Sequence, residues 1–307
     1  MEYVLRTFGL CKKYKKQFAV NDADMTIRRG DIYGFVGENG SGKTTIIRLI
    51  TGLIFPHSGR FELFGVDSKS QKIEEVRRKV GAVVESPSIY QNMSAAENLK
   101  MQCMILGLPA DERIAKTLSE VGLGQLLNDK KHVSNFSLGM RQRLGIAMAL
   151  LGEPEFLILD EPMNGLDPAG IVEIRELILK LNRERNITFL ISSHILSELS
   201  LVATKYGIIS KGHIIKEITA AKLQEEMSKT TDITVDNPEE LYKLLAGLYE
   251  EKSIRYIPNG VRLMGEININ EVLSAVIGNG IHITSVNCKE SSFEDYYLET
   301  IGGARYE

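Results

Sequence analysis

The sequence contains few cysteines, and these lie far apart. Cys11, Cys103 and Cys288 are the three thiols among 307 residues. Their odd number and wide spacing provide neither a disulfide framework nor a metal-binding cluster. Isolated thiols of this kind are typical of a protein from a reducing compartment, where we expect this chain to work.

Long apolar runs and an excess of basic residues are also absent. No stretch approaches the ~20 apolar residues that a membrane-spanning helix needs, and the first residues do not have the pattern of a signal peptide. The formal net charge is −3, which indicates no broad basic surface for nucleic acid. We therefore expect no nucleic-acid partner, and we expect any work at a membrane to depend on a partner protein.

The composition that remains is that of an ordinary globular protein. Hydrophobic residues make up 43% of the chain and charged residues 25%, so sizeable cores can form. A chain of this length is expected to fold as about two domains.

The strongest motif is the segment 37–44, Gly-Glu-Asn-Gly-Ser-Gly-Lys-Thr, which matches the phosphate-binding loop pattern G-x-x-x-x-G-K-[ST]. It follows an apolar run over 31–36, expected to be a buried strand, and precedes a helix expected over 45–51. A glycine-rich turn without a ligand is the alternative, but strand, loop and helix together are the context that phosphate binding requires. The candidate nucleotide-binding residues of this segment are Gly37, Glu38, Asn39, Gly40, Ser41, Gly42, Lys43, Thr44 and Thr45.

Within this loop, Lys43 provides a point charge for the β- and γ-phosphates, and Thr44 a hydroxyl for Mg²⁺. A basic turn lies upstream at 12–16, between strands expected over 3–8 and 18–27. Its lysines are most simply solvated, whereas Tyr14 is expected either to be half-buried or to stack on a purine.

Two carboxylates follow an apolar strand expected over 156–159. Asp160 and Glu161 then lie at the carboxyl end of a buried parallel strand, where the ligands of open α/β sheets bind. Asp160 is suited to hold Mg²⁺, and Glu161 is suited to activate a water molecule. His194 directly follows the next expected strand, over 188–192. A lone histidine is usually structural, but this position also suits a contact to a γ-phosphate.

Two helices have clear start signals. Ser137 and Gly139 begin a helix expected to run to about residue 151, and they form either an anion site or a simple N-cap. Asp167 and Pro168 are expected to begin a helix that ends near residue 185. A Met-rich helix expected over 94–107 is either core or an adaptable docking surface.

The remaining expectations concern the outer parts of the chain. The sequence predicts a strand over 60–66, helices over 71–79 and 110–121, a strand over 80–84, a polar linker over 122–135, and a hairpin over 205–218 that turns at Lys211 and Gly212. A helical linker is expected over 220–230. From residue 231 the pattern is strand, helix, two hairpin strands, helix, strand and helix, which predicts a small α+β domain with a ferredoxin-like order and no catalytic constellation.

The ordered motifs over about 3–219 resemble the nucleotide-binding subunit of ABC transporters. The resemblance implies an α/β P-loop NTPase cassette with a mostly parallel sheet, an N-terminal antiparallel β layer and a helical subdomain over about 86–150. The domains would be 1–219 and an accessory α+β domain over 220–307. The matching segments are Tyr14 (adenine-stacking aromatic), 37–44 (Walker A), 137–142 (signature), 156–161 (Walker B), 165–167 (D-loop) and His194 (switch histidine).

The same resemblance implies a mechanism. Two copies of the chain would enclose two ATP molecules with Mg²⁺, and Walker A of one copy would face Ser137 and Gly139 of the other. Asp167 would join the nucleotide site, and Glu161 would activate the attacking water. The homodimer would drive a transmembrane permease formed by a separate chain. It would thus be cytoplasmic and peripheral on the cytoplasmic face of the cell membrane.

Three positions depart from the family pattern. Glu85 stands where glutamine is usual, near the expected Mg²⁺ and attacking water, and is therefore a candidate catalytic and metal-binding residue. Leu138 and Met140 replace the usual residues of the signature. These features resemble the bacitracin- and lantibiotic-type branch, in which export of peptide antibiotics, or immunity against them, is common. A soluble, non-transport ABC ATPase and a ligand-sensing regulator are the alternatives.

Overall fold

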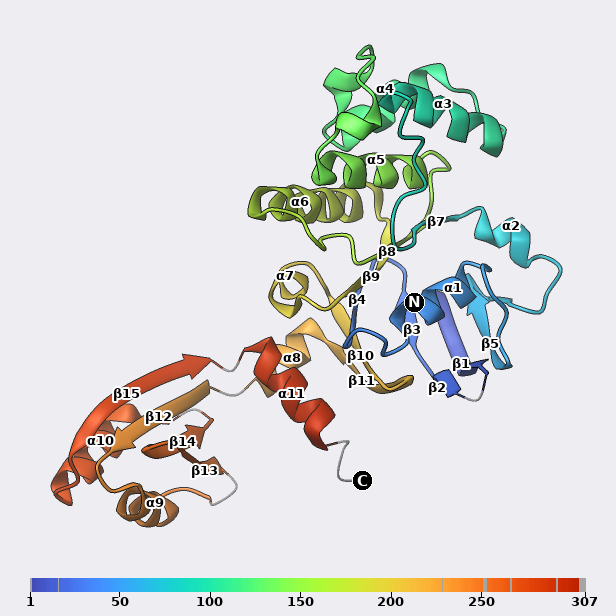
Figure 1. Ribbon diagram of the computed structural model, residues 1–307. Helices are drawn as coiled ribbons and strands as arrows, with labels where there is room; N and C mark the ends of the chain where they lie inside the picture. Colours follow the sequence, from blue (N-terminus) through green and yellow to red (C-terminus); the bar gives the residue numbers. More distant parts are fainter. Residues whose placement is uncertain are drawn as a thin grey trace. The chain divides into compact units, whose positions relative to one another are not determined.

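The structure is a computed structural model that describes residues 2–15, 17–227, 229–250, 253–265, 267–290 and 292–303. The chain divides into two compact units, Met1–Ala220 and Ala221–Glu307. Figure 1 labels the helices and strands of both units. Each unit is described by itself below.

Within the described residues, the central layer of the first unit is a six-stranded sheet of order β11-β10-β4-β9-β8-β7. Five of its strands run parallel, and β11 pairs antiparallel with β10 at one edge. The predicted hairpin turn at Lys211 and Gly212 is confirmed. The strands are β4 (Ile32–Val36), β7 (Val80–Val83), β8 (Phe156–Asp160), β9 (Thr188–Ser193), β10 (Lys205–Ser210) and β11 (His213–Thr219).

A second, antiparallel sheet comes mostly from the N-terminal part of the chain. It comprises β1 (Tyr3–Tyr14), β2 (Gln17–Ala23), β3 (Thr26–Arg28), β5 (Ser58–Leu63) and β6 (Val66–Asp67). The predicted end of the first strand at residue 8 was wrong, because Lys13 pairs with Phe18 and Tyr14 with Gln17. Lysines are compatible with a strand whose side chains reach solvent. The predicted strand over 18–27 is divided between β2 and β3.

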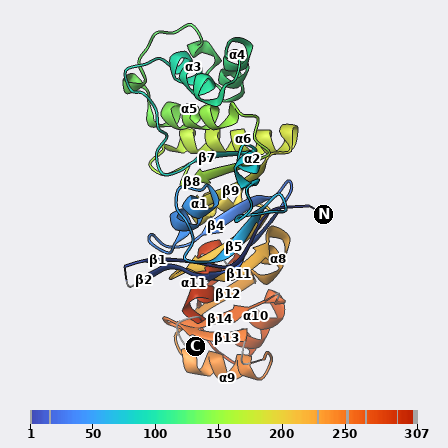
Figure 2. The same cartoon turned by 90° about the vertical axis from the view of Figure 1, so that its right-hand side faces the viewer.

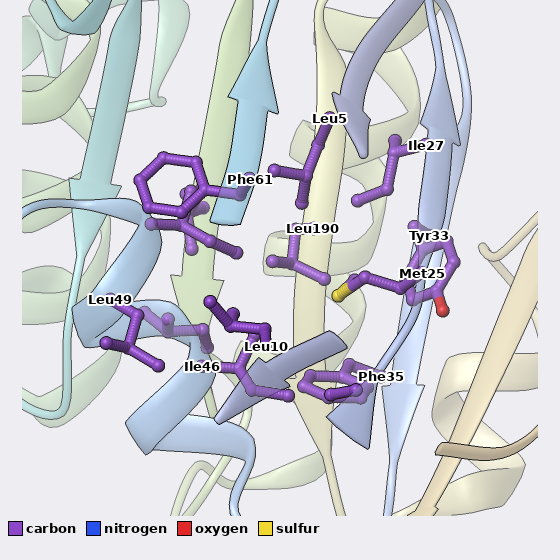
Figure 3. Close-up of a cluster of buried hydrophobic side chains, with 14 of the residues drawn as sticks. Leu5, Leu10, Met25, Ile27, Tyr33, Phe35, Ile46, Leu49, Phe61 and Leu190 are labelled. Carbon is purple, nitrogen blue, oxygen red and sulfur yellow. The ribbon is translucent and has the colours of Figure 1, made fainter. Parts of the chain in front are cut away.

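The main core lies between these two sheets and helix α1 (Lys43–Ile50). Figure 3 shows Leu10, Phe35, Ile46 and Leu190 pointing into this shared space, and each of them is fully buried. Burying side chains of this size stabilises the fold by roughly 1.5–3 kcal/mol each. The helix that follows the phosphate loop is therefore fixed to both sheets by its apolar face.

A partly buried polar network joins strands of both sheets. The Tyr33 hydroxyl donates to Glu217 Oε1 at 2.9 Å, and Lys205 Nζ lies 3.0 Å from the same oxygen. The Thr26 N–H and hydroxyl also donate to the Glu217 carboxylate. Burial and the Glu217 charge raise the pKa of Tyr33 well above its ordinary value, so its hydroxyl remains a donor and β4 stays tied to β11.

Three helices of the first unit, α3, α4 and α5, pack together as a subdomain. Figures 1 and 2 both show α3 and α4 next to α5, with α6 on the other side of α5. Ser94 and Glu97 form a capping box at the start of α3, a feature that stabilises a helix by about 1 kcal/mol. The helices are α2 (Ile73–Arg77), α3 (Ala95–Leu106), α4 (Asp111–Glu120), α5 (Leu138–Leu150), α6 (Pro168–Arg185) and α7 (Leu196–Ser200).

Two expectations for the first unit were incomplete. The segment 122–135 was expected to be a polar linker, but it forms two short 3₁₀ turns, Gly124–Leu126 and Val133–Asn135. Leu123, Leu126 and Val133 are buried, so the segment is part of the core. The sequence did not predict α7, because five residues are too few to show a helical period.

The second unit contains a four-stranded antiparallel sheet of order β13-β14-β12-β15 among its described residues. Its elements follow the β-α-β-β-α-β order of the predicted ferredoxin-like arrangement. It has its own core, which includes Ile233, Leu241, Val261 and Val272. The elements are β12 (Lys229–Val235), α9 (Pro238–Ala246), β13 (Ile254–Ile257), β14 (Gly260–Met264), α10 (Ile269–Gly278), β15 (Ile283–Glu290) and α11 (Phe293–Gly303), preceded by α8 (Ala220–Glu226).

Among the residues that the structure describes, no helix is both long and apolar enough to span a lipid bilayer.

Because each unit has its own core, we expect a chain truncated after Ala220 to fold by itself. Thermal unfolding followed by circular dichroism should give one cooperative transition, and the truncated chain should still bind ATP. A second truncation after Met227, which keeps α8, is the control. Loss of a folded first unit in both truncations would contradict an accessory role for the second unit.

Candidate nucleotide site

The site is assembled at one edge of the central sheet. Strands β4, β9 and β8 are neighbours and run parallel, so their carboxyl ends lie side by side. The phosphate loop follows β4, His194 follows β9, and β8 ends at Asp160, followed by Glu161. Residues from three distant parts of the sequence therefore meet where an open α/β sheet binds its ligands.

Close backbone contacts hold the phosphate loop. A Cβ atom at Gly37 would lie 2.5 Å from the Ile209 carbonyl oxygen, and one at Gly42 would lie 2.6 Å from that of Ala19. Gly42 also has a φ of 115°, in the region that favours glycine. The Gly212 N–H donates to the carbonyl of Ser41 at 2.8 Å. The loop is thus held between β2 and the β10–β11 turn.

Lys43 lies inside this loop with only 5% of its side chain exposed. Its Nζ donates to the carbonyls of Gly37 at 2.6 Å and Glu38 at 3.2 Å, and it lies 3.5 Å from Glu161 Oε1. The Ser41 hydroxyl is buried and has no hydrogen-bond partner among the described residues. A phosphate in the loop would therefore meet a buried cation and a free hydroxyl.

Asp160 ends β8 and is 1% exposed. Its Oδ1 accepts a hydrogen bond from the Ser192 hydroxyl at 2.5 Å. Its Oδ2 is buried and lacks a hydrogen-bond partner in the described part of the chain. A buried carboxylate oxygen without a donor is costly unless a cation compensates its charge, so this oxygen fits a metal ligand.

Glu161 follows in a strained backbone conformation, with a φ of +52°. Its N–H donates to the hydroxyl of Ser192 at 2.9 Å and to the carbonyl of the same residue at 3.2 Å. Its Oε2 lies 2.7 Å from His194 Nδ1. Because an ionised carboxylate only accepts, Nδ1 carries the proton of this contact. The predicted acid and histidine are thus in direct contact.

Glu85 has a different partner from the one expected. It follows β7 with a φ of +61°, and its Oε1 lies 2.5 Å from the Arg48 guanidinium, on α1. The Glu85 side chain is 60% exposed. A contact to Mg²⁺ would require the carboxylate to leave Arg48, so a catalytic or metal-binding role for Glu85 stays a prediction.

The other predicted residues lie on elements around this edge. Ser137 and Asp167 are the N-caps of α5 and α6, where they accept hydrogen bonds from the N–H groups of Met140 and Gly170. Gly139 lies in the first turn of α5. Tyr14 ends β1, is 45% exposed, and has Lys12 Nζ 5.5 Å from its ring centroid. Their contacts to a nucleotide remain predictions.

Ser192 and Arg48 were not predicted from the sequence. Ser192 lies opposite Asp160 in the β8–β9 register, and this position becomes visible only when the two strands are paired. Arg48 lies on α1, far from Glu85 in the sequence. A serine directly after the apolar run 189–191 was the one signal that the sequence offered for Ser192.

Comparison with known proteins gives the family of this chain. A family model described as "ABC transporter" matches residues 20–164. The bacitracin transport ATP-binding protein BcrA of Bacillus licheniformis is 41% identical over 305 residues, which cover 99% of both chains. The chain belongs to the ABC transporter family.

Two further relatives match only part of this chain, about three quarters of it. The lantibiotic transport ATP-binding protein SrtF of Streptococcus pyogenes is 42% identical over 226 residues, covering 73% of this chain and 95% of the relative. The structure of cbiO1 from Clostridium perfringens, part of the ABC transporter complex cbiONQ, matches with a TM-score of 0.66 and 29% identity. That match covers 74% of this chain and 92% of the other.

These findings confirm the predicted family, the P-loop α/β fold and the ATPase class. Cassettes of this family bind ATP or ADP, and the role of the loop over 37–44 in holding the nucleotide stays a prediction. The similarity to the bacitracin and lantibiotic branch is also confirmed.

We expect Glu85→Gln to keep ATPase turnover within about twofold of the unaltered protein, because an exposed ion pair such as Glu85–Arg48 is worth under ~1 kcal/mol. Glutamine has the same length and removes a negative charge from the vicinity of the phosphates. Steady-state phosphate release measures the effect, with Glu75→Gln on α2 as an exposed control. A loss of turnover confined to Glu85→Gln would show that the acid is required.

Proposed function

We propose that the chain is the ATP-hydrolysing subunit of a transporter that exports a peptide antibiotic of the bacitracin type. The match to the bacitracin transport protein BcrA carries this proposal, since it extends over 99% of both chains. It therefore includes the second unit, whereas the match to SrtF leaves about a quarter of this chain unaligned. We infer an accessory role for residues 221–307.

In this proposal, Lys43 binds the phosphates, and Thr44 and Asp160 hold Mg²⁺. The free Oδ2 of Asp160 and the half-buried Thr44 in the first turn of α1 are hard oxygen donors. No group of three His, Cys, Asp or Glu side chains suited to a metal occurs in the described residues. This agrees with Mg²⁺, which uses one or two carboxylates along with phosphates and water. Bound there, the ion would neutralise charge that develops on the phosphates.

Glu161 acts as the general base in the proposed reaction. Its carboxylate lies between Lys43 and His194, and its Oε1 is buried without a hydrogen bond in the described structure. That oxygen is suited to accept a proton from the attacking water. His194 orients the carboxylate through Nδ1. The other ring nitrogen of His194, Nε2, is proposed to contact the γ-phosphate.

We infer that two copies complete each site. Ser137 is exposed at the N-terminus of α5, where the helix dipole and free N–H groups attract anions. A second copy would present this N-terminus to the γ-phosphate bound by Lys43. Hydrolysis would remove the bridging charge and allow the two copies to separate.

Replacing the proposed base should separate binding from turnover. We expect Glu161→Gln to bind ATP normally, to lose turnover by roughly 10²–10⁴-fold, and to accumulate as an ATP-bound dimer in size-exclusion chromatography. In cells that depend on this chain, the variant should also abolish protection against bacitracin. Near-normal turnover would contradict the role of Glu161, and unchanged bacitracin sensitivity with lost turnover would contradict the substrate.

The C-terminal half of α3 provides a docking surface for the proposed membrane partner. Leu99 and Cys103 are fully buried, so this helix has a core face, as one of the two expectations predicted. Met104, Ile105 and Leu106 are 69%, 66% and 45% exposed. Consecutive exposed apolar side chains that include methionine are typical of a partner surface.

We expect Ile105→Glu to prevent recovery of a hydrophobic partner with the protein from detergent-solubilised membranes, because the charge would be buried in the interface. ATP binding should be unchanged. Leu201→Glu is the matched control, since Leu201 is also an exposed apolar residue, at 57%, just after α7. Failure of the unaltered protein to bring down any membrane partner would favour a soluble ABC ATPase or a regulator instead.

A further inference from the structure

One serine contacts both carboxylate residues of the site. Ser192 lies in β9, where every residue is buried, and it is 0% exposed. Its hydroxyl lies 2.5 Å from Asp160 Oδ1 and 2.9 Å from the backbone nitrogen of Glu161. The proposed metal ligand and the proposed general base therefore share this hydroxyl.

The direction of both hydrogen bonds follows from their chemistry. A serine hydroxyl has a single proton to donate, and an ionised carboxylate can only accept. The proton of Ser192 therefore goes to Asp160, and the oxygen of the same hydroxyl accepts from the Glu161 N–H. Both bonds are formed at once without competing for the same proton.

The bond to Asp160 selects one orientation of its carboxylate. The terminal torsion of an aspartate is broad and is not fixed by rotamer preference alone. Because Oδ1 is held by Ser192, the rotation is fixed and Oδ2 is left as the buried oxygen without a hydrogen bond in the described chain. Without the hydroxyl, both oxygens would lack a donor and the orientation would be free.

The bond to Glu161 holds a strained backbone. A φ of +52° is unfavourable for glutamate and persists only where the surroundings enforce it. The hydroxyl and the carbonyl of Ser192 both accept from the Glu161 N–H. They thereby fix the direction in which the side chain leaves the end of β8.

We propose that Ser192 is a positioning residue for ATP hydrolysis, whose hydroxyl orients Asp160 toward the metal and Glu161 toward the attacking water. The proposal rests on the proposed function, which assigns those two roles. If Ser192 has this role, loss of its neutral hydroxyl weakens metal binding as well as turnover.

The adjacent residue offers a matched control. Ser193 is also buried, at 3% exposure, but its hydroxyl accepts from the Ile195 N–H at 2.9 Å and lies 3.4 Å from the Ile195 carbonyl. Both of these contacts stay within the turn after β9. Ser193→Ala removes the same group from the same strand and leaves both carboxylates with their partners.

The test compares Ser192→Ala with Ser193→Ala in the full chain. Mn²⁺ affinity of the ADP-loaded protein is measured from the electron paramagnetic resonance signal of free Mn²⁺, and kcat and KM for ATP are measured separately. We expect Ser192→Ala to weaken Mn²⁺ binding and to lower kcat by ~10–100-fold each, with KM changed much less. Ser193→Ala should alter neither, and Ser192→Thr, which keeps the hydroxyl, should restore metal binding.

Equal Mn²⁺ affinity in Ser192→Ala and Ser193→Ala would overturn the proposal. If Ser192→Ala does not fold, Ser192→Cys, with a weaker donor of similar shape, should show a smaller loss of the same kind, and an unchanged affinity there would overturn it equally. Asp160→Asn distinguishes failure of the Ser192 proposal from failure of the proposed function. An unaffected Mn²⁺ affinity in Asp160→Asn would contradict the metal site of the proposed function itself.

Discussion

The site depends on the compensation of charge at the end of a buried sheet. Lys43, Asp160 and Glu161 all lie where water has little access, and an uncompensated charge there would be strongly unfavourable. In the structure, Lys43 is balanced by Glu161 and by two loop carbonyls. At the proposed site, ATP with its metal ion would change this balance, since it would bring both anionic oxygens and a cation. Binding would then exchange one set of buried charge partners for another.

Much of this site could be predicted from the sequence because its residues follow local rules. Gly37 and Gly42 are required by close backbone contacts, and Asp167 with Pro168 gives a helix start that depends only on neighbouring residues. The acids after β8 and the histidine after β9 could be placed because parallel strands end at a common edge. Local pattern and sheet direction were sufficient for these features.

What the sequence did not predict depends on pairing between distant segments. Ser192 acquires its role only from the register that places it opposite Asp160. The Arg48–Glu85 pair joins a helix to the end of a strand across 37 positions of chain, and no local pattern indicates it. The extension of β1 to Tyr14 has the same cause, because the basic residues are kept extended by pairing with β2. Solvated lysines alone would suggest a turn.

The attachment of the phosphate loop has a consequence for how the protein is made. The loop contacts Ala19 on one side and Ile209 and Gly212 on the other, so its final shape needs segments from both ends of the first unit. A ribosome adds roughly 5–20 residues per second, and the β10–β11 turn emerges long after the loop itself. A nascent chain thus carries a complete phosphate-loop sequence for roughly ten seconds or more before the residues that enclose the loop have been made. The contacts that fix the loop are therefore completed only when one of the last structural elements of the cassette has been synthesised.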